Sequence, residues 1–278
     1  MPSLDINILI DEPAETYHAK ASEYLSSHQL LTYMQCPQLY ARKRAGLIPE
    51  SDTPSYFLGR AAHTRILEGR DTYEREFAVG GPINPTTGKP FGSTTKKFLE
   101  WQDAQRKSVI PLEKAELIEA MNAGVRRNPV ACELLAHGKA EGVLRTTYLE
   151  FPCQIRIDWT NPEFGIVDLK TCDDLTWFES DARRFRYVHQ LAFYQNVLNQ
   201  VIGQLVPVYM IAVEKKEPFR CGVWQLPSET LLMASHEIEG AMERLRTATR
   251  EDKFETGYEE LRYLFLNEHH EKTMPQLR

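Results

Sequence analysis

The order of segments along the chain predicts an α/β fold with a mixed, mostly antiparallel sheet flanked by helices. Two observations lead to this fold class. Helical periodicity fills the first half of the chain, and three strand-like runs, a long helix, two further strands and a final helix follow it. In addition, 42% of the 278 residues are hydrophobic and 26% are charged, which is typical of a chain that buries a large core.

Two helices are expected in the N-terminal part of the chain. Ser27 suits the N-cap of a helix that continues to about Arg44, with leucines and Met34 on its apolar side. A shorter helix is expected over residues 56–67, and Gly69 would close it.

The next segment is rich in Gly, Pro and Thr. It covers residues 80–94 and predicts an ordered loop or a mobile flap. Residues 95–123 return to helical periodicity. We expect a break in this helix near Pro111, because proline cannot continue a helix.

Short runs rich in β-branched residues mark the strands of the expected sheet. These runs cover residues 142–150, 153–159, 165–171, 206–213 and 219–226. A long helix over residues 175–202 separates the third run from the fourth, and a last helix with Ser228 as its N-cap ends near Thr249.

This pattern divides the chain into three parts: an irregular N-terminal arm over residues 1–27, one domain over residues 28–250, and a polar tail over residues 251–278. No apolar run reaches 18 residues, so we expect no transmembrane helix and no membrane partner. The five cysteines are scattered and form no C-x-x-C pair. This spacing argues against a disulfide framework, a zinc ribbon and an iron–sulfur cluster, and it favours a reducing cytoplasm.

The charge balance does not exclude nucleic acid as a substrate. The chain carries 33 Lys and Arg against 39 Asp and Glu, for a net charge of −6. A protein that coats nucleic acid is usually basic. An acidic enzyme can still bind nucleic acid when its cations line one channel, and several short clusters of Lys and Arg occur here.

The most informative residues are Asp158, Asp168 and Lys170. If the two strands that carry them pair about a turn centred near residue 163, Asp158 lies opposite Asp168. Two facing carboxylates repel, and a divalent cation between them, Mg²⁺ or Mn²⁺, would remove the conflict. Lys170 would share the face of Asp168, where its ammonium could orient a water or stabilise charge on a phosphate. This chemistry is phosphodiester hydrolysis, although a surface hairpin with an Asp–Lys pair explains the same spacing.

The same residues resemble the PD-(D/E)-x-K nuclease signature, with Ile157 in place of the proline. Upstream, the stretch from Gly59 to His63 resembles the G-x-x-x-H motif of the RecB-like branch, which implies that the histidine is a metal ligand. Downstream, Gln190 and Tyr194 resemble the Q-x-x-x-Y motif. Taken singly, His63 could be an ordinary helix histidine, and Gln190 and Tyr194 the polar edge of a packed helix.

The similarity extends to the nuclease domain of RecE, exodeoxyribonuclease VIII. The stretches that carry it are Tyr17–Ala19, Leu30–Tyr40 and Arg183–Tyr194, and it covers roughly residues 15–230. The resemblance implies a restriction-endonuclease-like core and a magnesium-dependent 5′→3′ exonuclease. Such an enzyme acts on double-stranded DNA ends and leaves 3′ single strands for annealing-type recombination in phages and prophages. It further implies a ring-shaped homo-oligomer and a RecT-type single-strand annealing protein as partner.

The resemblance also assigns further site residues. Glu141 occupies the position of a family glutamate before the first core strand and is a candidate active-site carboxylate, although a solvated residue at a strand start explains it equally. Arg183 and Arg186 lie on the helical stripe of Gln190 and Tyr194, and we expect the two arginines and Tyr194 to contact DNA.

Three other functions remain open at this stage. The first is an endonuclease of the same fold, and the second is a nuclease of a defence system, which the lack of a C-terminal cysteine triplet disfavours. The third is a DNA-end-binding module without catalysis.

Overall fold

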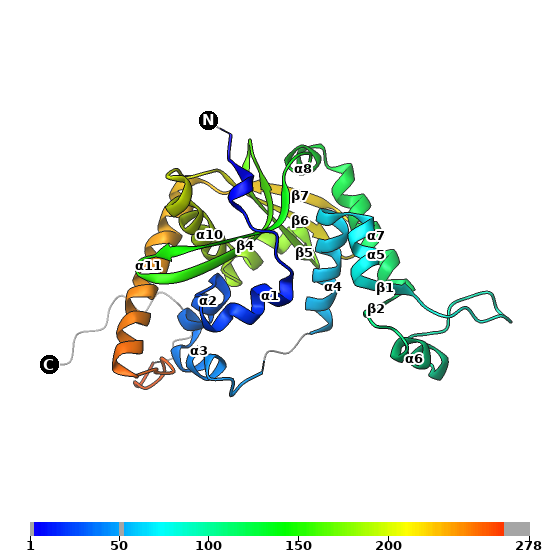
Figure 1. Cartoon of the computed structure of the whole chain (residues 1–278), viewed down its shortest axis with the longest axis horizontal. Helices are drawn as coiled ribbons and strands as arrows, with labels where there is room; N and C mark the ends of the chain where they lie inside the picture. Colours follow the sequence, from blue (N-terminus) through cyan, green and yellow to red (C-terminus); the bar gives the residue numbers. More distant parts are fainter. Residues whose placement is uncertain (1–2, 50–52, 264–278) are drawn as a thin grey trace.

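A five-stranded sheet lies at the centre of the molecule, between two groups of helices (Figure 1). The computed structural model describes residues 3–49 and 53–263. The strands are β3 (Lys139–Tyr148), β4 (Phe151–Asn161), β5 (Gly165–Cys172), β6 (Val208–Glu214) and β7 (Cys221–Gln225), in that spatial order. Only β5 and β6 pair in parallel, and the other neighbours are antiparallel. The predicted α/β fold with a mixed, mostly antiparallel sheet is confirmed.

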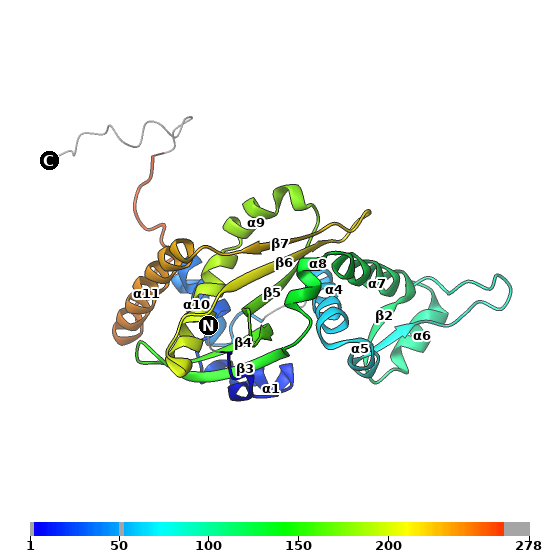
Figure 2. The ribbon, with the colours of Figure 1, turned by 90° about the horizontal axis from the view of Figure 1, so that it is seen from above.

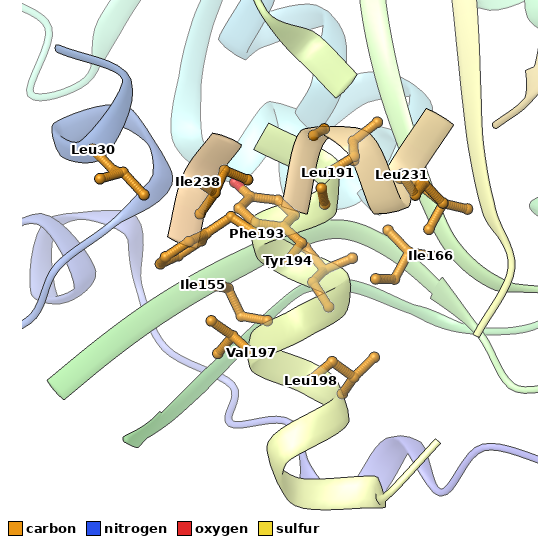
Figure 3. Packing of buried hydrophobic residues seen from close by; sticks show 14 of the residues in the cluster. Leu30, Ile155, Ile166, Leu191, Phe193, Tyr194, Val197, Leu198, Leu231 and Ile238 are labelled. Carbon is orange, nitrogen blue, oxygen red and sulfur yellow. The ribbon is translucent and has the colours of Figure 1, made fainter. Parts of the chain in front are cut away.

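One face of the sheet packs against α2 (Ser27–Gln35), α10 (Tyr187–Ile202) and α11 (Ser228–Glu251). The parallel pairing of β5 and β6 needs a crossover, and α10 lies within it. Figure 3 shows the apolar side of α10 packed between the sheet and α11. Phe193 and Val197 are each at most 1% exposed, so each side chain contributes about 1.5–3 kcal/mol through burial.

The other face is covered by α4 (Pro54–His63), α7 (Leu112–Arg127) and α8 (Pro129–Leu134), as the second view shows (Figure 2). A second core cluster forms there, in which Ile118 and Met121 of α7 are buried together with Val167 and Leu169 of β5. Because β5 is covered on both faces, its sequence reads as a nearly continuous apolar run. The two polar residues that interrupt this run, Asp168 and Lys170, therefore stand out.

The helix expected between Ser27 and Arg44 is two helices, α2 and α3 (Pro37–Arg44). Its N-cap is Ser26 rather than Ser27, since Ser26 forms a capping box with Gln29. Cys36 is extended, with φ −159°, and Pro37 is the first residue of the next helix. The residue before a proline avoids the helical conformation, which explains the break.

A small two-stranded parallel sheet projects at one end of the molecule and was not predicted (Figures 1 and 2). It pairs β1 (Phe77–Gly80), which follows α5 (Arg70–Glu76), with β2 (Ser108–Pro111), and α6 (Lys96–Asp103) lies between these strands in the sequence. Strands of four residues are too short to show a period, so the sequence could not indicate them.

The helix expected over residues 175–202 is also divided, which is a correction with consequences for the site. A 3₁₀ turn, Leu175–Trp177, leads into α9 (Phe178–Arg184), and α10 begins only at Tyr187. Arg186 between these helices has φ 56°, a left-handed conformation that ends helical continuity. Arg183 and Arg186 therefore do not lie on one continuous helical stripe with Gln190 and Tyr194.

The predicted N-terminal arm contains a short helix, α1 (Ala14–Ala19), and packs on the sheet. Leu9 and Leu25 are buried, and bridges join Ile10 to Val143 and Leu25 to Cys153. Of the predicted tail, residues 264–278 lie outside the described residues. Within the described part, no helix is long and apolar enough to cross a membrane.

Candidate active site

The pairing of β4 with both neighbouring strands is interrupted at Asp158. On one side, the β3–β4 ladder pairs Ala140 with Trp159 and Gly142 with Ile157, but it skips the step between Glu141 and Asp158. On the other side, the β4–β5 ladder ends at the pair of Trp159 and Val167. Glu141 has φ 52°, which costs a non-glycine residue about 1–2 kcal/mol. Strained backbone of this kind is concentrated at functional sites.

The β4–β5 register agrees with a turn centred at residue 163, because Trp159 pairs with Val167. The two aspartates are nevertheless not a cross-strand pair. The strands separate beyond Trp159, and Asp158 Oδ2 instead accepts a hydrogen bond of 2.9 Å from the backbone N–H of Leu169. This bond holds the Asp158 side chain against β5 at Leu169, which directly follows Asp168.

Three potential metal ligands meet at this opening. His63, Glu141 and Asp158 each offer one ligand atom, and these atoms all lie within 4.8 Å of one another. His63 is the last residue of α4, and its Nδ1 lies 3.4 Å from Asp158 Oδ2. A π-helical turn, Thr64–Glu68, follows directly, and such turns are frequent at functional sites.

Asp168 and Lys170 form an ion pair beside this group. Lys170 Nζ lies 2.6 Å from Asp168 Oδ2 and 4.9 Å from the centre of the Tyr187 ring. Asp168 is 1% exposed, and its Oδ1 has no hydrogen-bond partner among the described residues. A buried carboxylate oxygen without a donor is costly unless a cation binds it.

The acidic side chains resist ionisation here. Burial raises the pKa of Asp158, and burial together with the charge of Asp158 raises the pKa of Glu141 to about 8. Burial also raises the pKa of Asp168 to about 6, although the Lys170 ammonium opposes this shift. For Lys170, the two aspartates outweigh burial and keep its pKa above the ordinary value. Three crowded carboxyl groups with raised pKa values are a physical indication of a cation site.

The donor set fits a divalent metal ion. Carboxylate oxygens from Glu141 and Asp158 are hard ligands of the kind that Mg²⁺ and Mn²⁺ prefer, and one imidazole nitrogen of His63 joins them. The carboxylate of Asp168 lies beside this group. The unpartnered Oδ1 of Asp168 is consistent with this assignment. His63, Asp158 and Asp168 were the ligands expected from the sequence. The structure brings His63 and Asp158 together with Glu141, whereas Asp168 is not part of this group of three and pairs with Lys170.

Gln190 and Tyr194 lie one turn apart on α10 and contact each other. Gln190 Nε2 donates to Tyr194 Oη at 3.2 Å, and burial raises the pKa of Tyr194. Asp158 and Asp168 raise it further, so the hydroxyl of Tyr194 lies near both aspartates. This hydroxyl stays protonated at neutral pH and can donate a hydrogen bond.

Among the residues that the structure describes, neither of the two arginines predicted to bind DNA forms one of the ion pairs of the acidic group, whose partners are His63, Arg156 and Lys170. Arg183 is exposed at the end of α9, where it donates to Ser180 Oγ at 3.4 Å. Arg186 lines a surface pocket of about 260 Å³. The other residues of this pocket are Met34, His236, Glu237, Gly240 and Arg244.

Two residues of the site were missed. Arg156 Nε lies 3.0 Å from Glu141 Oε2 and supplies a second cation to the acidic group. Tyr187 packs its ring under Lys170. The spacing places Arg156 on the strand face of Asp158, two residues earlier, and Tyr187 on the helix of Gln190, three residues earlier, but neither spacing indicates the contact with Glu141 or with Lys170.

An acidic group and a lysine on adjacent strands, with a histidine from a preceding helix, define the class of PD-(D/E)XK-type nuclease folds. The chain belongs to the family described as "PDDEXK-like domain of unknown function (DUF3799)", whose model matches residues 26–264. It therefore lies in the PD-(D/E)XK superfamily, whose nucleases use divalent metal ions.

Solved structures show the same fold. A crystal structure of a "putative exonuclease" from Eubacterium rectale superimposes with a TM-score of 0.68 at 15% sequence identity. The similarity covers 92% of this chain and 96% of that chain. Among curated proteins, none matches.

Proposed function

We propose that this protein is a magnesium-dependent exonuclease that degrades double-stranded DNA from its ends in the 5′→3′ direction. The observation that carries the proposal is the meeting of His63, Glu141 and Asp158 at one point, beside the ion pair of Asp168 and Lys170. The exonuclease description of the Eubacterium rectale protein supports it, and the direction of digestion comes from the RecE-like motifs.

His63, Asp158 and Asp168, with Glu141, would hold the metal ion. Bound there, the ion would supply charge stabilisation at the phosphate and lower the pKa of the attacking water. The Lys170 ammonium is held by Asp168, from where it would orient that water and stabilise negative charge on a phosphate oxygen. Tyr194 can donate a hydrogen bond to the DNA strand, and Gln190 orients its hydroxyl.

The reaction follows from these positions. The water oxygen attacks the phosphorus in line with the 3′ oxygen, and the P–O3′ bond breaks. One product then carries a 5′-phosphate and the other a 3′-hydroxyl. The Lys170 ammonium is fixed by Asp168, so its charge needs no reorganisation when the phosphate becomes more negative.

The wider role also rests on the RecE-like motifs. In this proposal, the enzyme leaves 3′ single strands for a RecT-type annealing protein in phage or prophage recombination, and it works as a ring-shaped homo-oligomer. A ring around the duplex explains how a subunit with a net charge of −6 can stay on DNA without tight binding.

The deciding experiment uses linear duplex labelled separately at its 5′ and 3′ ends, incubated with Mg²⁺ or with EDTA. The proposal expects loss of the 5′ label first, only with Mg²⁺, and no digestion of covalently closed plasmid. Cutting of closed circles would point to an endonuclease of the same fold. Binding of ends without any cleavage would point to a non-catalytic module.

A further inference from the structure

Phe185 is a large aromatic side chain that remains half exposed beside the site. It lies between α9 and α10, and 51% of its surface is accessible. Exposing a phenyl ring to water loses the stabilisation that its burial would bring. The ring therefore calls for an explanation in terms of what it contacts.

The ring of Phe185 is connected to the ion pair by direct contacts. Phe185 stacks on Tyr187 with ring centres 5.8 Å apart and an interplanar angle of 28°. Tyr187 in turn lies under the Lys170 ammonium, at 4.9 Å. Phe178 packs against Tyr187 as well and is 1% exposed, so Tyr187 rests on the core. The series Lys170–Tyr187–Phe185 thus leads from the site to the surface.

The backbone conformation of Arg186 fixes how the rings of Phe185 and Tyr187 are oriented. Arg186 has φ 56°, a conformation that costs a non-glycine residue about 1–2 kcal/mol. This left-handed residue separates Phe185 from Tyr187, so the turn determines how the two rings meet. The anchored α10 holds Tyr187, Gln190 and Tyr194 in one rigid element, to which Phe185 is joined.

One cation lies over the exposed ring. The Arg184 guanidinium lies 5.2 Å from the centre of the Phe185 ring, and Arg183 is exposed one residue earlier. Exposed aromatic rings flanked by positive charge are the usual means of binding single-stranded nucleic acid, because bases stack on the ring and phosphates meet the cations.

We propose that Phe185 is a stacking platform for an unpaired base next to the phosphate that is cleaved. This inference rests on the proposed function and specifies its substrate: the terminal nucleotides would be held unpaired rather than as an intact duplex. Phe185 is a positioning residue, since it would place the strand whose phosphate reaches Lys170.

This proposal is tested by a thermodynamic cycle in which the Phe185 ring and single DNA bases are removed separately and together, and the losses in affinity are compared. Linear duplexes carry an abasic position at the first, second or third nucleotide of the 5′-ended strand. Affinity is measured by fluorescence anisotropy, with Ca²⁺ in place of Mg²⁺ and phosphorothioate linkages at the end to prevent digestion. The proteins are the wild type, Phe185→Leu, which removes the ring, and Phe185→Tyr, which keeps it.

The proposal expects one abasic position to weaken wild-type binding about tenfold, which equals about 1.4 kcal/mol and falls in the range for one stacked base. Phe185→Leu should lose the same tenfold on intact DNA and show no further loss at that abasic position. Phe185→Tyr should behave as the wild type does. In Mg²⁺, Phe185→Leu should raise KM more than it lowers kcat.

Tyr258 provides the matched control. It is 74% exposed, and Arg262 lies 4.2 Å from its ring. It is therefore, like Phe185, an exposed aromatic residue with an arginine neighbour, but it lies in the C-terminal segment. Tyr258→Leu should leave the cycle unchanged. Equal responses of the wild type and Phe185→Leu to every abasic position would overturn the stacking role.

Digestion of unmodified linear duplex in Mg²⁺ separates the two proposals. If the wild type digests this duplex but shows no coupling between Phe185 and any base, only the stacking role fails. If the wild type neither binds nor digests DNA ends, the proposed function fails, and the stacking role fails with it.

Discussion

The surroundings of three carboxyl groups disfavour their ionised forms, namely those of Asp158, Asp168 and Glu141. Burial raises the pKa values of all three, and the charge of Asp158 raises those of Glu141 and Asp168 further, while Lys170 and Arg156 offset only part of the cost. A chain selected for stability alone would not retain such a group. A divalent cation that binds there during function would compensate the cost of ionising these carboxyl groups.

Replacement of Lys170 tests the catalytic assignment. Lys170→Ala should lower the rate of duplex digestion by at least about 100-fold, because one preorganised charge at the phosphate is removed. Asp168→Ala should abolish digestion. Circular dichroism should show an unchanged fold in both variants. Lys114→Ala, on the exposed face of α7, is the control, and undiminished activity in either site variant would refute the assigned roles.

Metal binding should stabilise the protein in a way that is independent of activity. At a Mn²⁺ concentration about 100 times the dissociation constant, the folded state gains about 2.7 kcal/mol, which corresponds to a rise of about 5–10 °C in Tm. Asp158→Asn should remove this rise while it preserves the side-chain shape. A rise of equal size in Asp158→Asn would show that the ion binds elsewhere.

At the residue level, the spacing of Asp158, Asp168 and Lys170 predicted a metal and phosphate site, and the resemblance to a known motif added His63. The structure brings His63 and Asp158 together and places the pair of Asp168 and Lys170 beside them, while their roles stay predictions. Arg156 was missed for the opposite reason, because arginines are common near nucleic-acid sites and nothing in the pattern ties this one to Glu141. That contact depends on the strand opening, which only the folded sheet shows.

At the scale of elements, the order of helices and strands could be predicted, but the breaks within helices could not. Periodicity shows which residues face the core, and it continues across an interruption when both pieces pack on the same core. Pro37 gave a local signal for one break. Arg186 gave none, because arginine has no preference for the left-handed conformation that it adopts here.

The end of β6 provides a test of stability at this scale. Glu214 is fully buried and accepts hydrogen bonds from Arg220 Nε at 2.8 Å and from the Leu175 N–H at 2.9 Å. Glu214→Gln should lower the free energy of unfolding by about 1–3 kcal/mol at pH 7, because charged hydrogen bonds are lost inside the protein. Urea denaturation measures this difference, and Glu116→Gln on the exposed face of α7 is the control.

The difference in the free energy of unfolding between the wild type and Glu214→Gln should depend on pH. Hydrogen bonding by Arg220 lowers the pKa of Glu214 from 4.5 to about 2 in the folded state, although burial opposes the shift. The stability that the carboxylate contributes is therefore complete above about pH 4.5 and is lost as the pH falls towards 2. The difference between wild type and Glu214→Gln should shrink over that interval. A constant difference would contradict the assigned ion pair.

At the scale of the whole molecule, the sheet and its two helical layers define a PD-(D/E)XK domain, while the assembly is a separate question. A ring should appear in light scattering coupled to size exclusion as one oligomer whose mass is a small multiple of 32.1 kDa. Digestion should then be processive, so that single molecules of DNA are fully degraded while others stay intact. A monomer with distributive digestion would contradict the ring.

In the proposed site, Asp158 and Asp168 bind one divalent cation together with His63 and Glu141. Anomalous diffraction from crystals soaked in Mn²⁺ would locate this ion. One peak is expected about 2.0–2.2 Å from oxygen atoms of both aspartates, the range for such ligands. If the crystals bound Mn²⁺ elsewhere and showed no peak at this position, the proposed metal site would be wrong.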